Sequence, residues 1–222
     1  MVQITDRPND PTTEYPLVDA YMRWALEAVE EVAGHEGIAA ALRHAKLEKY
    51  INNYPLEETE VVTGVTWGEY ASLNAGLLTF YGRAGRGIVK RVGRITAQKA
   101  FEHQSDLFNL AAVLAAKTMP VATQIKMGLT AQMAGLKIMC EKAGYEWKGT
   151  IEDKGTTYHV ILETDPLTAG KSSDTMMGWL MEGAMEQAAL MAFGKTLDVT
   201  QIACRSMGAE ASIWEAPKRF ED

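Results

Sequence analysis

The residue types best suited to chemistry lie near the C-terminus, in the segment 194–214. There Cys204, one of only two cysteines in the chain, precedes a glycine-centred turn between two predicted short strands. A zinc site needs about four nitrogen, sulfur or oxygen ligands. The same hairpin offers only Gln201 and Ser212, which are poor ligands, and the other thiol, Cys140, falls within a predicted helix. We therefore interpret Cys204 as a small buried side chain of an apolar hairpin.

A second candidate is the segment Gly82–Arg94, in which glycines alternate with basic residues and no acid occurs. Backbone amides of a glycine-rich helix start, together with basic side chains, can hold a phosphate. Neither the dinucleotide-binding nor the phosphate-loop glycine pattern is present, however. We favour a helix junction in which glycine permits close packing. The basic residues would then be solvated or paired with carboxylates, and they are Arg83, Arg86, Lys90, Arg91 and Arg94.

No combination of side chains typical of catalysis occurs in the sequence. The four histidines are scattered outside the patterns of metalloenzymes. Glu182 and Glu186 lie four residues apart on one helical face, which we interpret as a solvated face rather than an acid–base pair. A methionine-rich stretch between residues 176 and 191 suits either an adaptable apolar pocket or ordinary core filling. The sequence therefore favours binding over catalysis, and we expect no cofactor.

Composition narrows the class of protein. The chain has 222 residues, of which 47% are hydrophobic and 23% charged, with a net charge of −7. An acidic chain argues against a nucleic-acid partner, because phosphate binding needs a basic surface. The scarcity of cysteine suits a reducing cytoplasm. The polar N-terminus lacks a signal-peptide pattern, and no apolar run is long enough to span a membrane. We expect a soluble cytoplasmic protein.

The periodicity of the apolar residues predicts a mainly helical N-terminal two-thirds. Residues 1–16 carry three of the seven prolines and are expected to form an extended arm. Thr66 and Glu69 fit the capping box that opens a helix. Glycines at 34, 144 and 194 follow apolar stripes of helical spacing and are expected to end helices. The predicted helices cover residues 16–34, 38–51, 66–80, 105–118, 120–142 and 173–193.

Beyond residue 144 the pattern changes to the two-residue period of β-strands. Apolar and polar residues alternate over 145–152 and again over 157–162, with a turn at 153–155 between them. Together with the C-terminal hairpin, this predicts an α+β fold in which helices pack on one face of a small antiparallel sheet built from two β-hairpins. We expect a single domain over residues 17–216, followed by a charged tail at 217–222.

The last forty residues resemble the 4-vinyl reductase domain family. That family ends in a helix and a cysteine-bearing hairpin, and the segment GWLMEGAMEQAALMAFGKTLDVTQIACRSMGAEASIW is similar to it. The upstream segment GLLTFYGRAGRGIVKRVGR is similar to the family's helix junction, so the resemblance extends from Ile38 to Glu215. The matching positions in the hairpin are Gly194, Val199, Cys204 and Gly208.

This resemblance implies a fold shared with small-molecule-binding domains and with subunits of trafficking complexes. It also implies a hydrophobic ligand and a homodimer formed through the helical region. Members that bind zinc do so through the hairpin's glutamate and two cysteines together with an upstream cysteine. Here Gln201 replaces the glutamate and Ser212 the second cysteine. The resemblance therefore implies that Gln201, Cys204 and Ser212 are a degenerate site that holds no metal.

We accordingly expect a stand-alone binding protein for a hydrophobic small molecule, such as a hydrocarbon, an aromatic or a tetrapyrrole-like compound, without catalysis of its own. The alternatives are a reductase-type enzyme or accessory factor in tetrapyrrole metabolism, and a dimeric scaffold without ligand. A binding protein should contain an apolar cavity of several hundred Å³, the scale of ordinary ligand sites. The predicted lining consists of Tyr145, Trp147, Tyr158, Val160, Trp179 and Met181.

Overall fold

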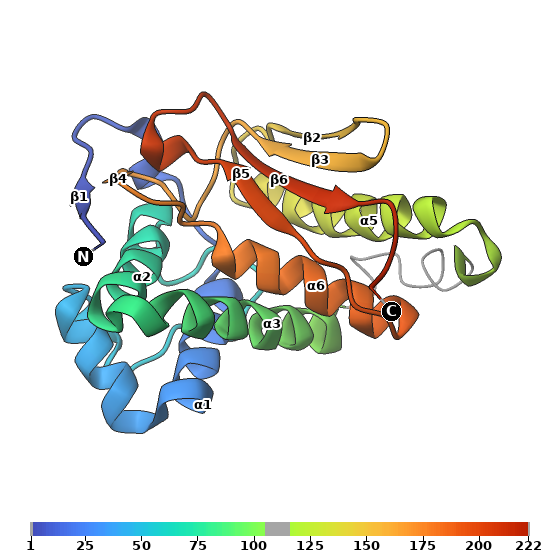
Figure 1. Cartoon of the computed structure of the whole chain (residues 1–222). Coiled ribbons are helices and arrows are strands. Elements are labelled where there is room, and N and C mark those ends of the chain that lie inside the picture. Colours follow the sequence, from blue (N-terminus) through green and yellow to red (C-terminus); the bar gives the residue numbers. More distant parts are fainter. Residues whose placement is uncertain (1, 105–115, 222) are drawn as a thin grey trace.

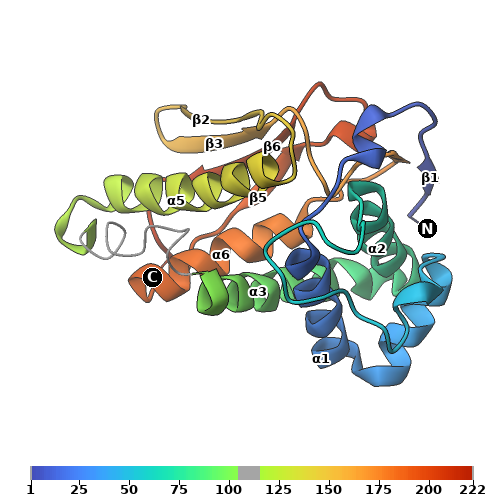
Figure 2. The same ribbon diagram turned by 180° about the vertical axis from the view of Figure 1, so that it is seen from behind.

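The computed structural model describes residues 2–104 and 116–221. Helices α1, α2 and α3 form the N-terminal part, and a four-stranded antiparallel sheet lies at the other side of the molecule (Figure 1). Helices α5 and α6 lie on one face of that sheet, and α3 lies beyond α6, as the reverse view also shows (Figure 2). The predicted α+β fold, with helices on one face of a small antiparallel sheet, is confirmed. Most of the helix predicted at 105–118 lies outside the described residues.

The N-terminal arm has more structure than an extended segment. Strand β1 (Ile4–Asp6) pairs with the short strand β4 (Lys171–Ser173), and a 3₁₀ helix covers Pro11–Glu14. The Asp10 carboxylate caps this turn by accepting hydrogen bonds from the Thr12 amide and hydroxyl, at 3.0 and 2.7 Å. The arm is thus tied to the loop that precedes α6.

Helix α1 (Asp19–His44) joins the first two predicted helices across a kink. Gly34 has φ of 73° within it, a conformation that favours glycine, so the helical pattern is interrupted where the sequence indicated an end. The helix stops at His44 rather than at residue 51, and a 3₁₀ turn covers Glu48–Tyr50. Helix α2 (Trp67–Phe80) begins with the predicted capping box, in which Thr66 and Glu69 exchange side-chain and backbone hydrogen bonds.

Helices α3 (Gly85–Gln104) and α6 (Trp179–Phe193) form the most extensive helix–helix contact among the described residues. A Cβ atom added to Gly93 would lie 2.8 Å from the Leu180 carbonyl carbon, and one added to Gly183 would lie 2.9 Å from that of Lys90. Only glycine permits this approach. The glycine-rich basic segment is therefore a helix junction, as we favoured from the sequence.

Helix α5 (Val121–Lys142) follows Pro120 as predicted, and Gly144, with φ of 85°, lies just beyond its end. The sheet has the order β2-β3-β6-β5, and all three pairings are antiparallel. In β3 and β6 alternate residues are buried, as the two-residue period predicted. The strands are β2 (Gly149–Asp153), β3 (Thr157–Leu162), β5 (Thr200–Ala203) and β6 (Ser212–Pro217).

Two further predicted boundaries were wrong. The first strand begins at Gly149, because residues 145–148 form the loop between α5 and the sheet. The last helix begins at Trp179 rather than at 173, because Lys171–Ser173 pairs with the N-terminal arm instead. Of the helices in the described ranges, none combines the length and hydropathy needed to cross a bilayer.

Candidate ligand cavity

A cavity of about 130 Å³ lies among α3, α5 and α6, with the N-terminal turns of α1 and α2 at one end. Its walls are almost wholly apolar, and no charged side chain or histidine is among the described residues that line it. The lining comprises Leu17, Tyr21, Trp67, Tyr70, Thr96, Ala97, Ala100, Phe101, Gly128, Ala131, Gln132, Leu136, Met139, Cys140, Tyr145, Trp147, Leu162, Pro166, Leu167, Leu180, Met181, Ala184, Ala188, Met191 and Ala192.

Small residues on three helices create this space. Ala97 and Ala100 face it from α3, Gly128 and Ala131 from α5, and alanines at 184 and 188 from α6. In each helix the spacing is three or four residues, so the small side chains lie one above the other on a single face. Protein interiors are otherwise close-packed. Because these side chains are short, the faces that carry them leave a void among the three helices.

Hydroxyl and thiol groups gather at the end of the cavity near α1 and α2. Burial raises the pKa of the Cys140 thiol to about 11, partly opposed by a hydrogen bond with Tyr145. Burial also raises the pKa of Tyr145, and the neighbouring Cys140 adds to that increase. The pKa of Tyr21 is raised by burial and then by Tyr70 and Cys140, which lie near it. The thiol and these phenols are therefore neutral at physiological pH.

An aromatic cluster fixes this end of the cavity. The rings of Tyr15 and Tyr145 stack with centroids 4.8 Å apart, and Trp67 meets both edge-on at 5.4 and 5.0 Å. Such offset and edge-to-face contacts stabilise a defined ring orientation. Because Tyr145 and Trp67 come from segments far apart in the sequence, the cluster joins the α5–β2 loop to the start of α2.

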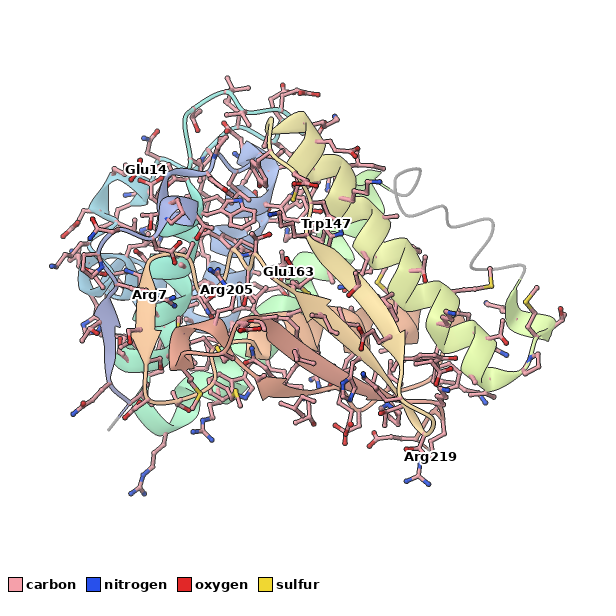
Figure 3. The ribbon with its side chains drawn as sticks, turned by 90° about the horizontal axis from the view of Figure 1, so that it is seen from above. Arg7, Glu14, Trp147, Glu163, Arg205 and Arg219 are labelled. Carbon is pink, nitrogen blue, oxygen red and sulfur yellow. The ribbon has the colours of Figure 1, made fainter. Side chains whose placement is uncertain are left out.

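Three of the six side chains predicted to line a pocket do so. Tyr145, Trp147 and Met181 line the cavity. Trp147 lies where the chain passes from α5 to β2 (Figure 3). The remaining three, Tyr158, Val160 and Trp179, are not among the described lining residues.

These three side chains have other neighbours. Val160 is fully buried opposite Trp214 in the sheet. The Tyr158 ring lies 4.6 Å from the Lys218 ammonium, and Trp179 stacks 4.8 Å from the Arg86 guanidinium. The alternation of apolar and polar residues in the strand correctly predicted that Tyr158 and Val160 are buried. It does not distinguish a side chain packed in the core from one that lines a cavity.

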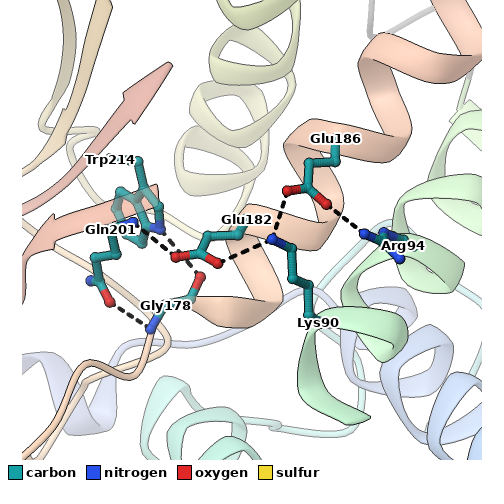
Figure 4. Close-up of polar contacts among 7 residues, drawn as sticks. All are labelled: Lys90, Arg94, Gly178, Glu182, Glu186, Gln201 and Trp214. Atoms are coloured by element: carbon teal, nitrogen blue, oxygen red, sulfur yellow. Dashed lines mark hydrogen bonds and ion pairs between the residues drawn. The ribbon is translucent and has the colours of Figure 1, made fainter. Parts of the chain in front are cut away.

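The opposite face of α6 carries a buried charge network (Figure 4). Lys90 of α3 lies 2.7 Å from the Glu186 carboxylate and 3.5 Å from that of Glu182, and Arg94 is 2.7 Å from Glu186. Glu182 is only 5% exposed, and its carboxylate accepts a 2.8 Å hydrogen bond from the backbone amide of Gln201. Our interpretation of Glu182 and Glu186 as a solvated face was therefore wrong.

This network links α6 to α3 and to β5. Burial raises the pKa of Glu182, although the Gln201 amide and Lys90 oppose the change. Burial lowers the pKa of Lys90, but the hydrogen bonds and charges of the two carboxylates raise it by more, so that the net change is upward. The Gln201 side chain accepts a 2.7 Å hydrogen bond from the Gly178 amide. Helix α6, which carries one wall of the cavity, is thus held both to α3 and to β5.

The residues of the predicted degenerate metal site are engaged in protein contacts. Cys204 lies 3.0 Å from the Ser206 hydroxyl, and Ser212 donates a 2.6 Å hydrogen bond to the buried Asp165. Burial raises the pKa of Asp165, and the Ser212 hydrogen bond opposes that change. Within residues 2–104 and 116–221, no three His, Cys, Asp or Glu side chains come together in a way that could hold a metal ion.

The C-terminal hairpin is also tied to the N-terminal arm. Arg7 donates hydrogen bonds to the carbonyl oxygens of Arg205 and Lys171, at 2.8 and 2.9 Å. Arg7 and Arg205 lie on neighbouring segments in Figure 3. The hairpin therefore has a structural role in joining the two small sheets.

Comparison with solved structures identifies similar folds. A Cs H-NOX mutant with 4-cyano-L-phenylalanine superposes with a TM-score of 0.58 at 13% identity, covering 93% of this chain and 97% of that one. An oxygen-binding H-NOX domain related to soluble guanylate cyclases superposes with a TM-score of 0.53 at 11% identity, covering 90% of this chain and 92% of that one. An H-NOX protein from S. oneidensis in the Fe(II)NO ligation state superposes with a TM-score of 0.50 at 12% identity, covering 90% of this chain and 100% of that one. At these identities the likeness shows the fold alone.

The same comparisons correct the family resemblance. No protein-family model matches the chain, and no curated protein matches it in sequence. These three solved structures are of H-NOX domains, so the identification with the 4-vinyl reductase domain was wrong. It rested on four matching hairpin positions and on the upstream segment 76–94, and two of the hairpin positions are Gly194 and Gly208. Both have positive φ, which turn geometry alone favours as glycine.

Proposed function

We propose that this protein binds a compact apolar molecule in the cavity among α3, α5 and α6. The observation that carries the proposal is a void of about 130 Å³ with almost wholly apolar walls. An apolar cavity of about 150 Å³ stays dry and binds benzene or xenon. Burial of apolar surface then supplies the binding free energy, at about 25 cal/mol per Å². The space is smaller than we expected from the sequence, and it favours a small hydrocarbon or aromatic ligand over a tetrapyrrole.

The similar folds raise the question of heme, since the function of heme distortion has been probed in the H-NOX family. Heme iron is held by a histidine, by a thiolate, by a tyrosinate, or by a methionine together with a histidine. Met139, Met181 and Met191 line the cavity, but no described lining histidine completes such a pair. None of the described histidines lines the cavity. Cys140 does, but its pKa of about 11 keeps the thiol protonated, and the lining tyrosines are likewise neutral. A porphyrin also needs more space than 130 Å³. The residues present do not fit heme.

The lining also gives no support to catalysis. Among the described residues that face the cavity there is no carboxylate, lysine or histidine, and the tyrosines and Cys140, which can also transfer protons, have raised pKa values. The predicted homodimer is not tested by a single chain and stays a prediction, which sedimentation would check.

Calorimetric titration with benzene tests the proposal, with two matched variants on α5. Ala131 lines the cavity, whereas Ala134, one turn away, is not among the described lining residues. We expect saturable binding to the unmodified protein and to Ala134→Leu, and loss of binding in Ala131→Leu because leucine fills the void. The proposal fails if benzene does not bind, or if both variants bind it equally well. A saturable shift of the Soret band of hemin on titration with the protein would contradict the exclusion of heme.

A further inference from the structure

Most polar side chains at the cavity have a partner within the protein. The Thr96 hydroxyl donates to the Val92 carbonyl oxygen at 2.9 Å, and the Gln132 amide lies 3.9 Å from the Met181 sulfur. The hydrogen bond between Tyr145 and Cys140 lowers the pKa of the thiol, against the larger effect of burial. These groups can be satisfied without a ligand.

Tyr70 differs from them. It lies on the second turn of α2, is 5% exposed and lines the cavity. Its hydroxyl makes no hydrogen bond with any of the described residues, and burial followed by the charge of Asp165 raises its pKa. A hydroxyl of a cavity-lining residue that has no partner in the protein can bond to whatever occupies the cavity. The neutral phenol offers a proton to whatever occupies the cavity.

The surroundings of Tyr70 contain further donors but no free anion. The Trp67 indole N–H acts on the Tyr145 hydroxyl and lowers the pKa of that phenol, although no hydrogen bond of ordinary geometry joins the two. The Tyr21 hydroxyl has no hydrogen-bond partner among the described residues. The nearest carboxylate that influences Tyr70, that of Asp165, is engaged by the Ser212 hydroxyl and the Leu167 amide. Among the described residues, this end of the cavity therefore offers the Tyr70 hydroxyl no free carboxylate as a partner.

We propose that the Tyr70 hydroxyl selects the ligand, by donating a hydrogen bond to an acceptor oxygen on an otherwise apolar molecule. This inference rests on the proposed function. The ligand class is a neutral compound about as large as benzene, with one carbonyl or ether oxygen. Neutrality follows from the lining, in which no described residue is charged. The apolar walls formed by α3, α5 and α6 bind the hydrocarbon part, and Tyr70 fixes its orientation.

Two probe molecules that differ in a single group test the assignment. Cyclopentanone and methylenecyclopentane have the same ring, and the ketone oxygen of one is a methylene group in the other. Each has six heavy atoms, as benzene does. We would measure the dissociation constants of both with the unmodified protein, Tyr70→Phe and Tyr158→Phe. Tyr158 serves as a control because it is not among the described lining residues.

We expect Tyr70→Phe to weaken cyclopentanone binding about 3- to 10-fold, the effect of one lost hydrogen bond. Binding of methylenecyclopentane should stay within about twofold, because the apolar contacts remain. Tyr158→Phe should change neither. Without ligand, Tyr70→Phe should unfold at no lower temperature than the unmodified protein, since no internal hydrogen bond is lost.

The outcomes separate the two proposals. If neither probe binds the unmodified protein, both the cavity function and the role of Tyr70 are wrong. If methylenecyclopentane binds but Tyr70→Phe does not affect the ketone selectively, the role of Tyr70 is wrong and the cavity function stands. A clear loss of stability in ligand-free Tyr70→Phe would show that the hydroxyl is already bonded within the protein, and would also overturn the inference.

Discussion

Replacing Gly93 by alanine tests the contact that positions α6 and hence one wall of the cavity. The added Cβ would lie 2.8 Å from the carbonyl carbon and 3.0 Å from the Cα of Leu180, with the carbonyl oxygen nearer still. Ordinary carbon–oxygen contacts are about 3.3 Å or longer. Since the obstacle is helix backbone, it cannot rotate away, and α3 and α6 must separate.

Two opposing effects determine how much Gly93→Ala changes the free energy of unfolding. Alanine gains about 1 kcal/mol over glycine in a helix. Overpacking in a close-packed core costs about 1–3 kcal/mol, and a gap of 0.5–1 Å along the rest of the interface forfeits about a quarter to a half of each contact energy. We expect the steric effect to prevail and the free energy of unfolding to fall by about 2 kcal/mol, which lowers Tm by about 4–8 °C in a chain of this length.

Gly87→Ala is the matched control, because the same substitution is made in the same helix at an exposed site with no atom within 4 Å of the added Cβ. It should raise stability by up to about 1 kcal/mol. Thermal and urea denaturation of both variants would measure the difference. If Gly93→Ala proves as stable as Gly87→Ala, the backbone contact between α3 and α6 is refuted, together with the position of the wall that α6 supplies.

Further predictions concern charge and the cavity thiol. Lys90→Met removes the cation that neutralises two buried carboxylates of α6. It should lower the free energy of unfolding by about 1–3 kcal/mol, less than for a fully buried pair because the lysine is partly exposed. Lys137→Met breaks only an exposed pair and should stay within about 0.5 kcal/mol in urea denaturation. In a Cys204→Ser background, alkylation of Cys140 at pH 8 should be about 100-fold slower than for a thiol of pKa 9. Its rate should rise up to about pH 11, and rapid alkylation at neutral pH would contradict the burial of this thiol.

Local signals in the sequence predicted the elements of the fold. The capping box at Thr66 placed the start of α2, and the alternation in β3 placed the buried face of the sheet, because both depend on residues close together in the chain. The start of α6 was missed since residues 171–173 pair with β1, some 165 residues away. No local pattern reports such a pairing.

The cavity itself was only partly predictable. Aromatic residues near the first hairpin suggested Tyr145 and Trp147, but alanines and glycines on α3, α5 and α6 create the space. Small residues at helical spacing equally well indicate a tight helix crossing, as Gly93 and Gly183 show. Likewise, the spacing of Glu182 and Glu186 identified one helical face but not what covers it. These distinctions depend on tertiary packing.

The binding of an apolar molecule in the cavity can be observed directly at the methionine methyl groups. Met139, Met181 and Met191 line the cavity, whereas Met207 and Met119 are exposed and are not among its described lining residues. In methionine-methyl-labelled protein titrated with benzene, we expect saturable chemical-shift changes at the three lining methyl groups and none at the two exposed ones. Unchanged methyl signals at saturating benzene, or equal changes at all five, would contradict it.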